Sequence, residues 1–481
     1  SLGEFFCTIR NSFCKNYKNR SLAMLFHSTR GGDKDKDFAS ILMQGLAEDG
    51  GLFMPDHWPQ IDIEKIKGLP SFIEVAKEIV PHFTASSFTH EETISIVENA
   101  WHDFEHKDLV GIKTIENISV LELFHGPTAA FKDFGLQLAA AFFNQVLEQE
   151  DKTAIVLGAT SGDTGSAAID ACRSYSRIKS FIMLPNGNMS EVQRRQMSTI
   201  AADNVFALRI NGTFDDCQDL VKKAFIQRDF LRSDQYLLAV NSINWTRIVG
   251  QICYYFYAYN QLASHQALNF SIPTGNFGNV FACYSAFKMG LPINTISVAV
   301  NDNDILHRFF GSNDYSKKQV HETISPSMDI SVASNFERLV YDFFLDRNAS
   351  KCAELFNNFP SQGIELDETT WSKKNKLFNS SSVNDAATQE IIQSIFQHHH
   401  YLLDPHTAVA MQEAMVSASD KNHFVVLATA HPAKFPDVYK KLDIDLTETP
   451  TALTGLFKKT EQLHHFDSNY DQITSFISSH N

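Results

Sequence analysis

Short apolar runs alternate with helical segments over the middle of the chain, and this alternation restricts the possible folds more than any other feature. The runs are TAIVLG from residue 153, SFIMLP from 180, NVFALRI from 204, NFSIPTG from 269 and NTISVAV from 294, with a last one, FVVLATA, near 424. Strands that alternate with helices predict an α/β fold with a parallel sheet covered on both faces. Such sheets bind ligands at the carboxyl ends of their strands, so we expect the functional residues there.

The regions around this alternation have different patterns. The stretch FASILMQGLAEDGGLF has helical periods broken by turns and predicts a mostly helical N-terminal unit, whereas the polar segment from about 301 to 395 predicts exposed loops or insertions. The first residues are basic and precede Met24, the expected natural start; a transit peptide, an upstream extension and a cloning remnant all fit them. We predict four parts: an extension at 1–25, an N-terminal domain at 26–107, a catalytic domain of two lobes at 108–445, and an amphipathic tail at 446–481.

Charge and composition argue against several functions. The formal net charge of −15 repels nucleic acid, and no long basic stripe opposes it. Seven scattered cysteines without a C-x-x-C pair make a disulfide framework or a zinc site improbable. Three consecutive histidines, His398 to His400, cannot all face one metal on a helix. The longest apolar runs are too short for a bilayer and read as buried helices. We therefore expect a cytoplasmic protein with neither a metal nor a membrane or nucleic-acid partner.

One lysine stands alone in an apolar stretch. In LELFHGPTAAFKDFGLQ, Lys132 lies between Phe131 and Phe134, and no other Lys or Arg occurs between Lys113 and Lys152. Burial would lower the pKa of this amine and free its lone pair for attack on a carbonyl carbon, as imine chemistry requires. The alternative is a lysine whose stem covers apolar surface while its amine reaches water.

Two glycine-rich loops follow predicted strands. In IVLGATSGDTGSAAIDA a helix is expected to begin near Gly165, with Ser161 and Thr164 as hydroxyl donors; in IPTGNFGNVFA, Gly275 and Gly278 let the backbone approach an oxyanion. Neither loop is a P-loop or a complete G-x-G-x-x-G fingerprint, and each could be an ordinary turn. Two anion sites beside an imine-forming lysine favour pyridoxal 5'-phosphate and an anionic substrate.

Two further segments carry candidate ligand-binding residues. AVNSINWTRIVGQ places Asn241, Ser242 and Arg247 ahead of an apolar helix, and the planar guanidinium suits a phosphate, although a surface helix charge is the simpler interpretation. In VVLATAHPAKF, Thr429 offers a hydroxyl at a strand end. Opposite a pyridine nitrogen, this neutral group would leave the ring less electron-poor than an aspartate would, but most strand threonines are structural.

Taken together, HGPTAAFKDFG, ATSGDTGSAA, VNSINWTRI, PTGNFGN and LATAHPAKF resemble the motifs of threonine synthases in order and spacing. The resemblance extends from about His27 to about Asp437 and is closest to the bacterial and fungal branch. It implies the tryptophan-synthase β-type fold (fold type II) of pyridoxal-phosphate enzymes, with two open α/β lobes and a preceding N-terminal domain.

The resemblance also implies a role for each matched residue. Lys132 matches the lysine that forms an imine with the cofactor, and Thr429 the partner of its pyridine nitrogen. The cofactor-phosphate loop corresponds to Gly275, Asn276, Phe277, Gly278 and Asn279. The loop for the substrate carboxylate corresponds to Ser161, Gly162, Asp163 and Thr164, with Asp163 also beside the cofactor's 3-hydroxyl; the substrate phosphate corresponds to Asn241, Ser242 and Arg247. Two positions depart from the family pattern: Asn279, where Asp is commoner, and Asn188, where many relatives carry a basic residue.

The implied reaction converts O-phospho-L-homoserine and water to L-threonine and phosphate, in a monomer or a homodimer. One alternative is a phospho-lyase on the same scaffold, which would release 2-oxobutyrate, ammonia and phosphate. A second is a catalytically silent homologue that acts as a binding module. A third, β-replacement as in cysteine synthesis, is disfavoured by the HGPT and NSINWTRI motifs.

Overall fold

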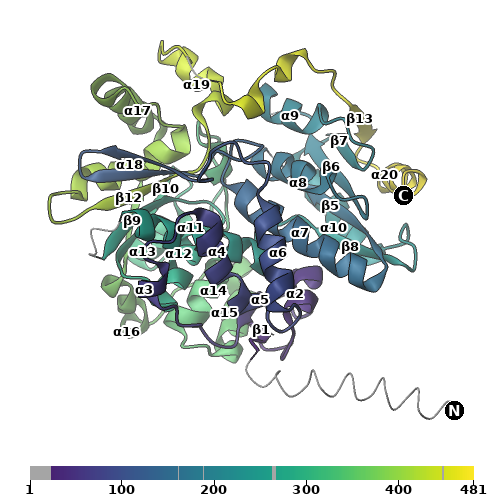
Figure 1. Ribbon diagram of the computed structural model, residues 1–481, viewed down its shortest axis with the longest axis horizontal. Coiled ribbons are helices and arrows are strands. Elements are labelled where there is room, and N and C mark those ends of the chain that lie inside the picture. The colour runs from purple at the N-terminus through teal and green to yellow at the C-terminus, as the bar shows by residue number, and fades with distance from the viewer. Residues whose placement is uncertain (1–22, 161, 188, 263–266, 447–448) are drawn as a thin grey trace.

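A computed structural model describes residues 23–160, 162–187, 189–262, 267–446 and 449–481. Two large sheets form two α/β lobes, and the N-terminal helices pack across both of them (Figure 1). Within the described residues, no helix is both long and apolar enough to cross a membrane.

The first lobe contains a six-stranded sheet in the order β11–β10–β9–β12–β4–β3. Neighbouring strands are parallel except β3 and β4, which are antiparallel. The strands are β3 (Gly111–Ile115), β4 (Ile118–Glu122), β9 (Leu268–Pro273), β10 (Ile293–Val300), β11 (Phe378–Ser382) and β12 (Phe424–Ala428). Every residue of β9 and β12 is buried, as expected for strands covered on both faces.

The second lobe contains a five-stranded, wholly parallel sheet in the order β13–β7–β6–β5–β8. Its strands are β5 (Thr153–Ala159), β6 (Ile178–Pro185), β7 (Val205–Asn211), β8 (Gln235–Ala239) and β13 (Leu463–Asp467). The six strands predicted from the apolar runs are all present, in two largely parallel sheets. β13 and α20 (Tyr470–Ser479) belong to the tail, which therefore completes this lobe.

Helices cover both faces of each sheet, because successive side chains along a strand pack against helices on opposite faces. In β12, Val426 packs with α17 (Asp385–His399) and α18 (Pro405–Ser417), whereas Val425 and Leu427 face α11 (Trp245–Gln261) and α12 (Gly278–Lys288). In the second sheet, one face packs on α10 (Phe214–Gln227) and α20, and the other on α7 (Lys132–Glu150) and α8 (Asp163–Arg173). The predicted arrangement, a parallel sheet with helices on both faces, is confirmed.

Helices α7 and α11 lie at the centre and contact each other backbone to backbone. A Cβ on Gly250 would lie 2.9 Å from the Phe134 carbonyl oxygen, and one on Gly135 would lie 3.1 Å from Arg247 Cα. Only glycine permits this approach. Every residue of α11 except the last is buried, so the helix serves as a shared core element.

The N-terminal region is mostly helical, as expected, and also contains a small antiparallel sheet of β1 (Phe26–Ser28) and β2 (Phe53–Pro55). Its helices are α2 (Phe38–Gln44), α3 (Ile63–Ile66), α4 (Phe72–Ile79), α5 (Pro81–Thr84) and α6 (His90–Ala100). Phe72 packs against Phe134 of α7, and Phe38 against Phe142, with ring centroids 5.2 Å apart in both pairs. The region therefore shares the core of the two lobes.

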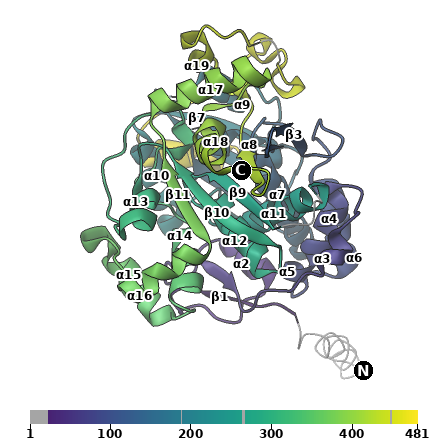
Figure 2. The ribbon, with the colours of Figure 1, turned by 90° about the vertical axis from the view of Figure 1, so that its left-hand side faces the viewer.

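The expectation of exposed loops between 301 and 395 is correct for residues 313–335, which contain one short 3-10 turn (Pro326–Met328) and are exposed at 317–322, but it is wrong for the rest of the segment. This segment forms α13 (Ile305–Ser312), α14 (Phe336–Leu339), a π-helical turn (Val340–Phe344), α15 (Ala349–Gln362), α16 (Glu368–Trp371), β11 and α17, seen beside the first sheet in Figure 2. Phe309, Phe336 and Phe344 are buried against one another. The many polar residues lie on the outer faces of short helices, so average polarity concealed the apolar positions between them.

Candidate active site

Lys132 is the first residue of α7, and its position is fixed by the neighbouring strand. The Phe131 N–H donates to the Thr429 carbonyl (2.8 Å), and Ala130 forms a bridge with Ala430 just beyond the end of β12. The Lys132 side chain is 13% exposed. Burial lowers its pKa; Asp163 opposes this effect, while Lys434 and Arg247 add to it. The amine thus has the environment expected of a nucleophile.

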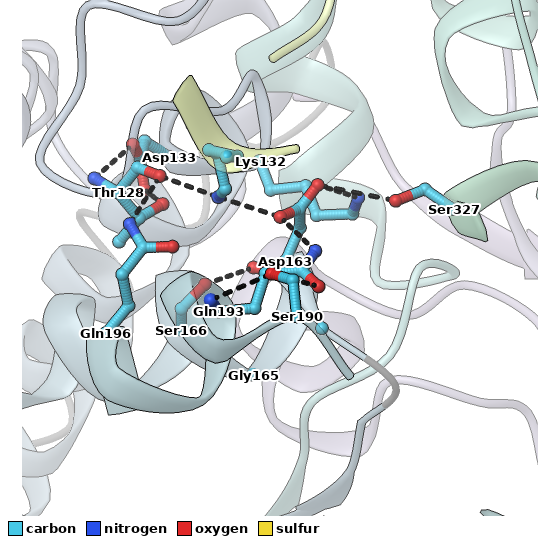
Figure 3. A network of polar contacts seen from close by, with 12 residues as sticks. Thr128, Lys132, Asp133, Asp163, Gly165, Ser166, Ser190, Gln193, Gln196 and Ser327 are labelled. Carbon is cyan, nitrogen blue, oxygen red and sulfur yellow. Dashed lines mark hydrogen bonds and ion pairs between the residues drawn. The ribbon is translucent and has the colours of Figure 1, made fainter. Parts of the chain in front are cut away.

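Asp163, the first residue of α8, lies opposite Lys132 (Figure 3). Its Oδ2 is 3.7 Å from Lys132 Nζ and accepts from the Ser327 hydroxyl (3.3 Å). Its Oδ1 is 2.7 Å from Lys434 Nζ and accepts from the Gln193 amide (2.9 Å). Burial by itself would raise the pKa of Asp163, but the two lysines hold it well below its usual range. Asp163 is therefore a buried carboxylate shared by two cations.

The HGPT loop is fastened beside this pair. The N–H and hydroxyl of Thr128 donate to the Asp133 carboxylate at 2.9 and 2.6 Å. The Thr128 carbonyl accepts from Lys434 Nζ (2.7 Å) and from the Gln196 amide (2.8 Å), which belongs to α9 (Glu191–Ser198). Burial raises the pKa of Asp133 to about 7. The loop is thus held to the start of α7 and to the Lys434 amine.

The second glycine-rich loop presents its backbone to the site. A Cβ on Gly275 would lie 2.8 Å from the Ser327 carbonyl oxygen, so the loop must pass close to that segment. Phe277 has φ +64° and buries its ring against Phe336 (centroids 5.4 Å apart). The Asn279 side-chain oxygen accepts from the Tyr254 hydroxyl. The side chains of Phe277 and Asn279 contact the core, so these residues would contact a ligand through their backbone N–H groups.

Two helices that begin at this place, α7 at Lys132 and α12 at Gly278, receive no capping hydrogen bond from the side chain of their N-cap residue, whereas in the first turn of α8 the Thr160 hydroxyl accepts from the Gly165 N–H (2.9 Å). In contrast, Asn244 caps α11 by accepting from the Thr246 N–H (3.1 Å). First-turn N–H groups have no intrahelical acceptor, and an uncapped end of α12 suits a phosphate. With the buried amine of Lys132, these residues fit pyridoxal phosphate.

Arg247 is a buried cation without an acidic partner. It is 3% exposed, donates from Nη1 to the Asn241 carbonyl (2.5 Å), and its Nε has no hydrogen-bond partner. No carboxylate in the described part of the chain forms an ion pair with it, and burial lowers its pKa to about 10. Ser242 contacts Ser334 (2.8 Å between hydroxyls), whose hydroxyl donates to the Asn276 side chain (3.3 Å). This segment is therefore joined to the cofactor-phosphate loop.

Thr429 follows β12 and is 6% exposed. Its N–H donates to the Thr407 hydroxyl (3.3 Å), which donates in turn to the Asp404 carboxylate. The other oxygen of that carboxylate contacts His406 Nδ1 (2.8 Å), and His406 Nε2 accepts from the Ser327 N–H (3.1 Å). A buried polar chain thus connects Thr429 to the loop that contacts Asp163.

The structure brings most of the predicted residues together. Gly162 is the N-cap residue of α8, and Thr164 lies half-buried in its first turn. The helix begins at Asp163, two residues before the expected Gly165. Ser161 and Asn188 lie outside the described residues. The described residues form no group of three or more His, Cys, Asp or Glu suited to a metal ion.

Sequence reasoning missed four residues that contact the site: Lys434, Gln193, Gln196 and Ser327. Lys434 had a signal, since it is the one cation in the LATAHPAKF motif, where only Thr429 was selected. The two glutamines and the serine occur in segments whose closeness to Lys132 depends on the tertiary fold.

Comparisons with known proteins agree with this geometry. Sequence models match for pyridoxal-phosphate-dependent enzymes at residues 114–354, for the threonine synthase N terminus at 25–101 and for the threonine synthase C-terminal region at 407–477. The threonine synthase of Pseudomonas aeruginosa is 43% identical over 95% of this chain and 98% of its own length.

Solved structures agree as well. The pyridoxal-phosphate-bound threonine synthase of Brucella melitensis superposes with a TM-score of 0.91 at 40% identity, covering 95% of this chain and 99% of the other. The yeast enzyme gives a TM-score of 0.88 at 34% identity, with 96% and 99% covered. A buried lysine at the start of a central helix, a buried carboxylate opposite it and matches of this extent lead to one conclusion: the chain belongs to the threonine synthase family of pyridoxal-phosphate-dependent enzymes.

Proposed function

We propose that the chain converts O-phospho-L-homoserine and water to L-threonine and phosphate, with Lys132 as the residue that binds the cofactor. One observation carries this proposal: a buried amine, Lys132, and a buried guanidinium, Arg247, with no acidic partner among the described residues, lie on adjacent helices, α7 and α11. An amine can bind an aldehyde and a guanidinium can bind a phosphate. Pyridoxal phosphate carries the aldehyde, and a phosphorylated amino acid carries an amine that can replace Lys132 on that aldehyde and a phosphate that can bind Arg247.

The residues that would hold pyridoxal phosphate come from four segments. Lys132 would bind its aldehyde carbon, and the backbone of residues 275–279 would bind its phosphate at the start of α12. Thr429 would face the pyridine nitrogen, and Asp163 would lie beside the 3-hydroxyl. When bound, the cofactor withdraws electrons from the substrate carbons next to the amine and so makes their protons acidic.

Lys132 would then act as the acid and base of the reaction. Its amine, when not bonded to the cofactor, would remove a proton from Cα, release that proton to solvent, and then, neutral again, remove one from Cβ. The C–O bond at Cγ breaks and phosphate leaves with the electron pair. The oxygen of water forms a new C–O bond at Cβ and the water gives up a proton; of the three protons released, one is returned at Cγ, one at Cα and one to the phosphate. The carboxylate of Asp163, 3.7 Å from Lys132 Nζ, stabilises the lysine whenever it carries the proton.

Arg247, Asn241 and Ser242 would bind the leaving phosphate, and residues 161–164 the substrate carboxylate. The Arg247 guanidinium has already lost its hydration in the folded protein, so its attraction for a dianion is little screened by water. The attraction between the Arg247 guanidinium and the phosphate is strongest as the C–O bond breaks, because negative charge then builds up on the departing oxygen.

Three further expectations from the sequence stay predictions. They are the division of the chain near residues 25, 107 and 445, a cytoplasmic location, and a monomeric or homodimeric state. The separation between the matched segments 25–101 and 114–354 supports the second boundary.

The purified protein should be incubated with pyridoxal phosphate and O-phospho-L-homoserine, and the product identified by mass alongside released phosphate. Threonine equimolar with phosphate is expected. Lys132→Ala should lower kcat by at least about 1,000-fold, because both the covalent anchor and the base are lost. Lys113→Ala, at an exposed position on β3, is the control and should keep full activity.

Other products would contradict the proposal in distinguishable ways. Phosphate with 2-oxobutyrate would identify a phospho-lyase. No phosphate release from protein that holds the cofactor would indicate another substrate or a silent homologue. Near-normal activity of Lys132→Ala would refute the assignment of this residue.

A further inference from the structure

Lys434 is the one lysine in the described part of the chain whose residue is completely buried. It ends a short 3-10 turn, Pro432–Lys434, that directly follows the strand-end residues Thr429 and Ala430. His431 fixes this turn, since its Nδ1 accepts from the Ala433 N–H (3.1 Å). Burying an ammonium group costs free energy unless fixed partners compensate its charge, so the partners of Lys434 indicate its role.

Those partners all belong to the site already described. Lys434 Nζ lies 2.7 Å from Asp163 Oδ1 and donates to the Thr128 carbonyl at 2.7 Å. Asp163 begins α8, and Thr128 belongs to the loop held by Asp133 at the start of α7. The single amine therefore joins three segments that converge on Lys132.

The two oxygens of Asp163 have unequal surroundings. Oδ1 receives two short contacts, from Lys434 Nζ (2.7 Å) and the Gln193 amide (2.9 Å). Oδ2 receives only longer ones, from Lys132 Nζ (3.7 Å) and the Ser327 hydroxyl (3.3 Å). Oδ1 is thus anchored by permanent partners, whereas Oδ2 is directed at the lysine whose protonation must change during the reaction.

We propose that Lys434 is a positioning residue of the active site: it anchors Asp163 through Oδ1 and keeps it ionised, so that Oδ2 stays directed at Lys132 in every protonation state of that amine. Without Lys434, Asp163 would depend on Lys132 as its only nearby cation. Each time Lys132 became neutral, a buried carboxylate would be left without compensation and would take up a proton or turn away.

The same arrangement affects Lys132. That amine faces Asp163 from α8, Lys434 from the 3-10 turn and Arg247 from α11, while Asp133 of its own helix is engaged by Thr128. The positive charge of Lys434 offsets part of the attraction that Asp163 exerts on a proton of Lys132. Removing Lys434 should therefore make Lys132 harder to deprotonate.

The test measures how fast the apo-protein captures pyridoxal phosphate as a function of pH, followed by the visible absorption of the bound cofactor without any substrate. Borohydride reduction and peptide mass then identify the modified lysine. Only the neutral amine of Lys132 attacks, so the profile reports its protonation. In Lys434→Met the midpoint of the profile should move up by about 1 pH unit or more, as expected when a neighbouring positive charge is lost. Lys440→Met, at an exposed position nearby, should not move it.

A second variant covers the case in which Lys434→Met folds or binds cofactor poorly. Lys434→Met combined with Asp163→Asn removes both charges and should fold and capture cofactor better than Lys434→Met alone, because no uncompensated carboxylate remains. If the double variant were no better than the single one, Lys434 would not act through Asp163, and the proposal would be overturned. It would equally be overturned if folded Lys434→Met kept the wild-type midpoint.

This inference rests on the proposed role of Lys132, and the two can fail separately. If wild-type protein captured the cofactor on another lysine, the proposed site would be wrong. If Lys132 were the modified residue but its midpoint did not depend on Lys434, only the present inference would be wrong. Neither result depends on the identity of the amino-acid substrate.

Discussion

Two buried or nearly buried lysines, Lys132 and Lys434, face one ionised carboxylate, Asp163, and a third buried cation, Arg247, acts on Lys132 from α11. The nearby Asp133 does not restore the balance, because burial raises its pKa to about 7. Excess positive charge in a desolvated site costs free energy unless an anion completes it. Cofactor and substrate each carry a phosphate, so their binding should offset the unfavourable free energy of this excess positive charge.

Arg247→Met tests this view at the level of one residue. We expect the KM for O-phospho-L-homoserine to rise by about 100-fold or more, because a charge-assisted contact to phosphate is lost from a desolvated site. The free energy of unfolding without ligands should change by no more than about 1 kcal/mol, since the lost hydrogen bond to Asn241 is offset by removal of an unpaired buried charge. Steady-state kinetics and urea unfolding measure the two effects.

Arg338→Met is the matched control. This arginine is also buried, but its guanidinium donates to the Phe53 and Ile243 carbonyls and to the Asn335 side chain. Its replacement should destabilise the protein by more than about 2 kcal/mol, because buried acceptors lose their donor. Equal loss of stability in both variants would show that Arg247, too, is structural.

The sequence was most informative for residues that carry an unusual local context. Lys132 could be selected because no other cation occurs near it, and Thr164 because it lies in a glycine-rich loop after a strand, whereas Asp163 was selected through the family resemblance. Gln193, Gln196 and Ser327 have no such context, and Lys434 had only its place as the one cation of a motif. Their roles arise from contacts between segments far apart in the chain, which a linear pattern does not contain.

Among the elements, α9 connects the C-terminal tail to the active site. Towards the site, Gln193 donates to Asp163 and Gln196 to the Thr128 carbonyl. Towards the tail, Arg194 donates twice to Glu461, at 2.9 Å each, and the Ser198 hydroxyl donates to Glu461 at 2.7 Å. The tail therefore supports the helix from which two site contacts come.

Glu461→Gln should loosen this support. Faster hydrogen exchange is expected in α9 and β13, together with a fall in cofactor affinity of about two- to tenfold, because an ion pair of moderate exposure is lost. The hydrogen bond with Arg194 lowers the pKa of Glu461 to about 2. The stabilisation from the Glu461–Arg194 ion pair is thus present above pH 4.5 and is lost as pH falls towards 2. The difference in α9 exchange between Glu461→Gln and wild type should therefore shrink over that range.

Asp219→Asn on α10 provides the comparison, because Asp219 also pairs with a nearby cation, Lys222, but on an exposed helix face away from α9. It should leave exchange in α9 unchanged. If Glu461→Gln likewise left α9 unchanged, the tail would not support this helix.

The elements that escaped prediction share a physical reason. β8 and β13 are the two edges of one sheet, and β3 and β11 are the edges of the other. Edge strands need less apolar character than central ones, as FNSSS in β11 illustrates, so their sequences resemble loops. β4 is buried but short, at five residues, and precedes a loop rather than a helix, so it did not stand out as part of the alternation.

For the whole molecule, the N-terminal region, predicted as a domain at 26–107, contributes aromatic side chains to the common core. Phe26 packs against Trp245 of α11 (centroids 6.1 Å apart), and Trp101 donates from its indole nitrogen to the Phe134 carbonyl (3.0 Å). The region covers α7 and α11, the helices that carry Lys132 and Arg247. Its helical periods were readable in the sequence, but its docking on these helices was not.

Acid should destabilise the whole fold through partly buried histidines. Partial burial, with a smaller contribution from His125, lowers the pKa of His431 to about 4, and it also lowers the pKa of His27 and His423. The unfolded chain therefore binds more protons than the native one between about pH 6.5 and pH 4, and stability falls as pH decreases through that range.

His431→Asn should reduce this acid sensitivity while keeping an acceptor for the Ala433 N–H. The drop in unfolding free energy between pH 7 and pH 4 should become smaller by up to about 3 kcal/mol, the equivalent of the His431 shift. Urea unfolding at both pH values measures it. His398→Asn, at the exposed end of α17, should leave the pH dependence as it is, and an unchanged dependence in His431→Asn would show that His431 does not contribute.

The contact between Gly135 and Gly250 has one last consequence. Lys132 lies one helical turn or less from Gly135, and Arg247 a similar distance from Gly250, so the closeness of the two backbones sets the span between the amine and the guanidinium. On the proposed assignment, the substrate carbons Cα and Cβ lie beside Lys132, and the substrate phosphate binds Arg247. Because neither glycine has a side chain, the two helices lie close together. We expect this spacing to select substrates by the number of carbons between the reacting Cα and the phosphate.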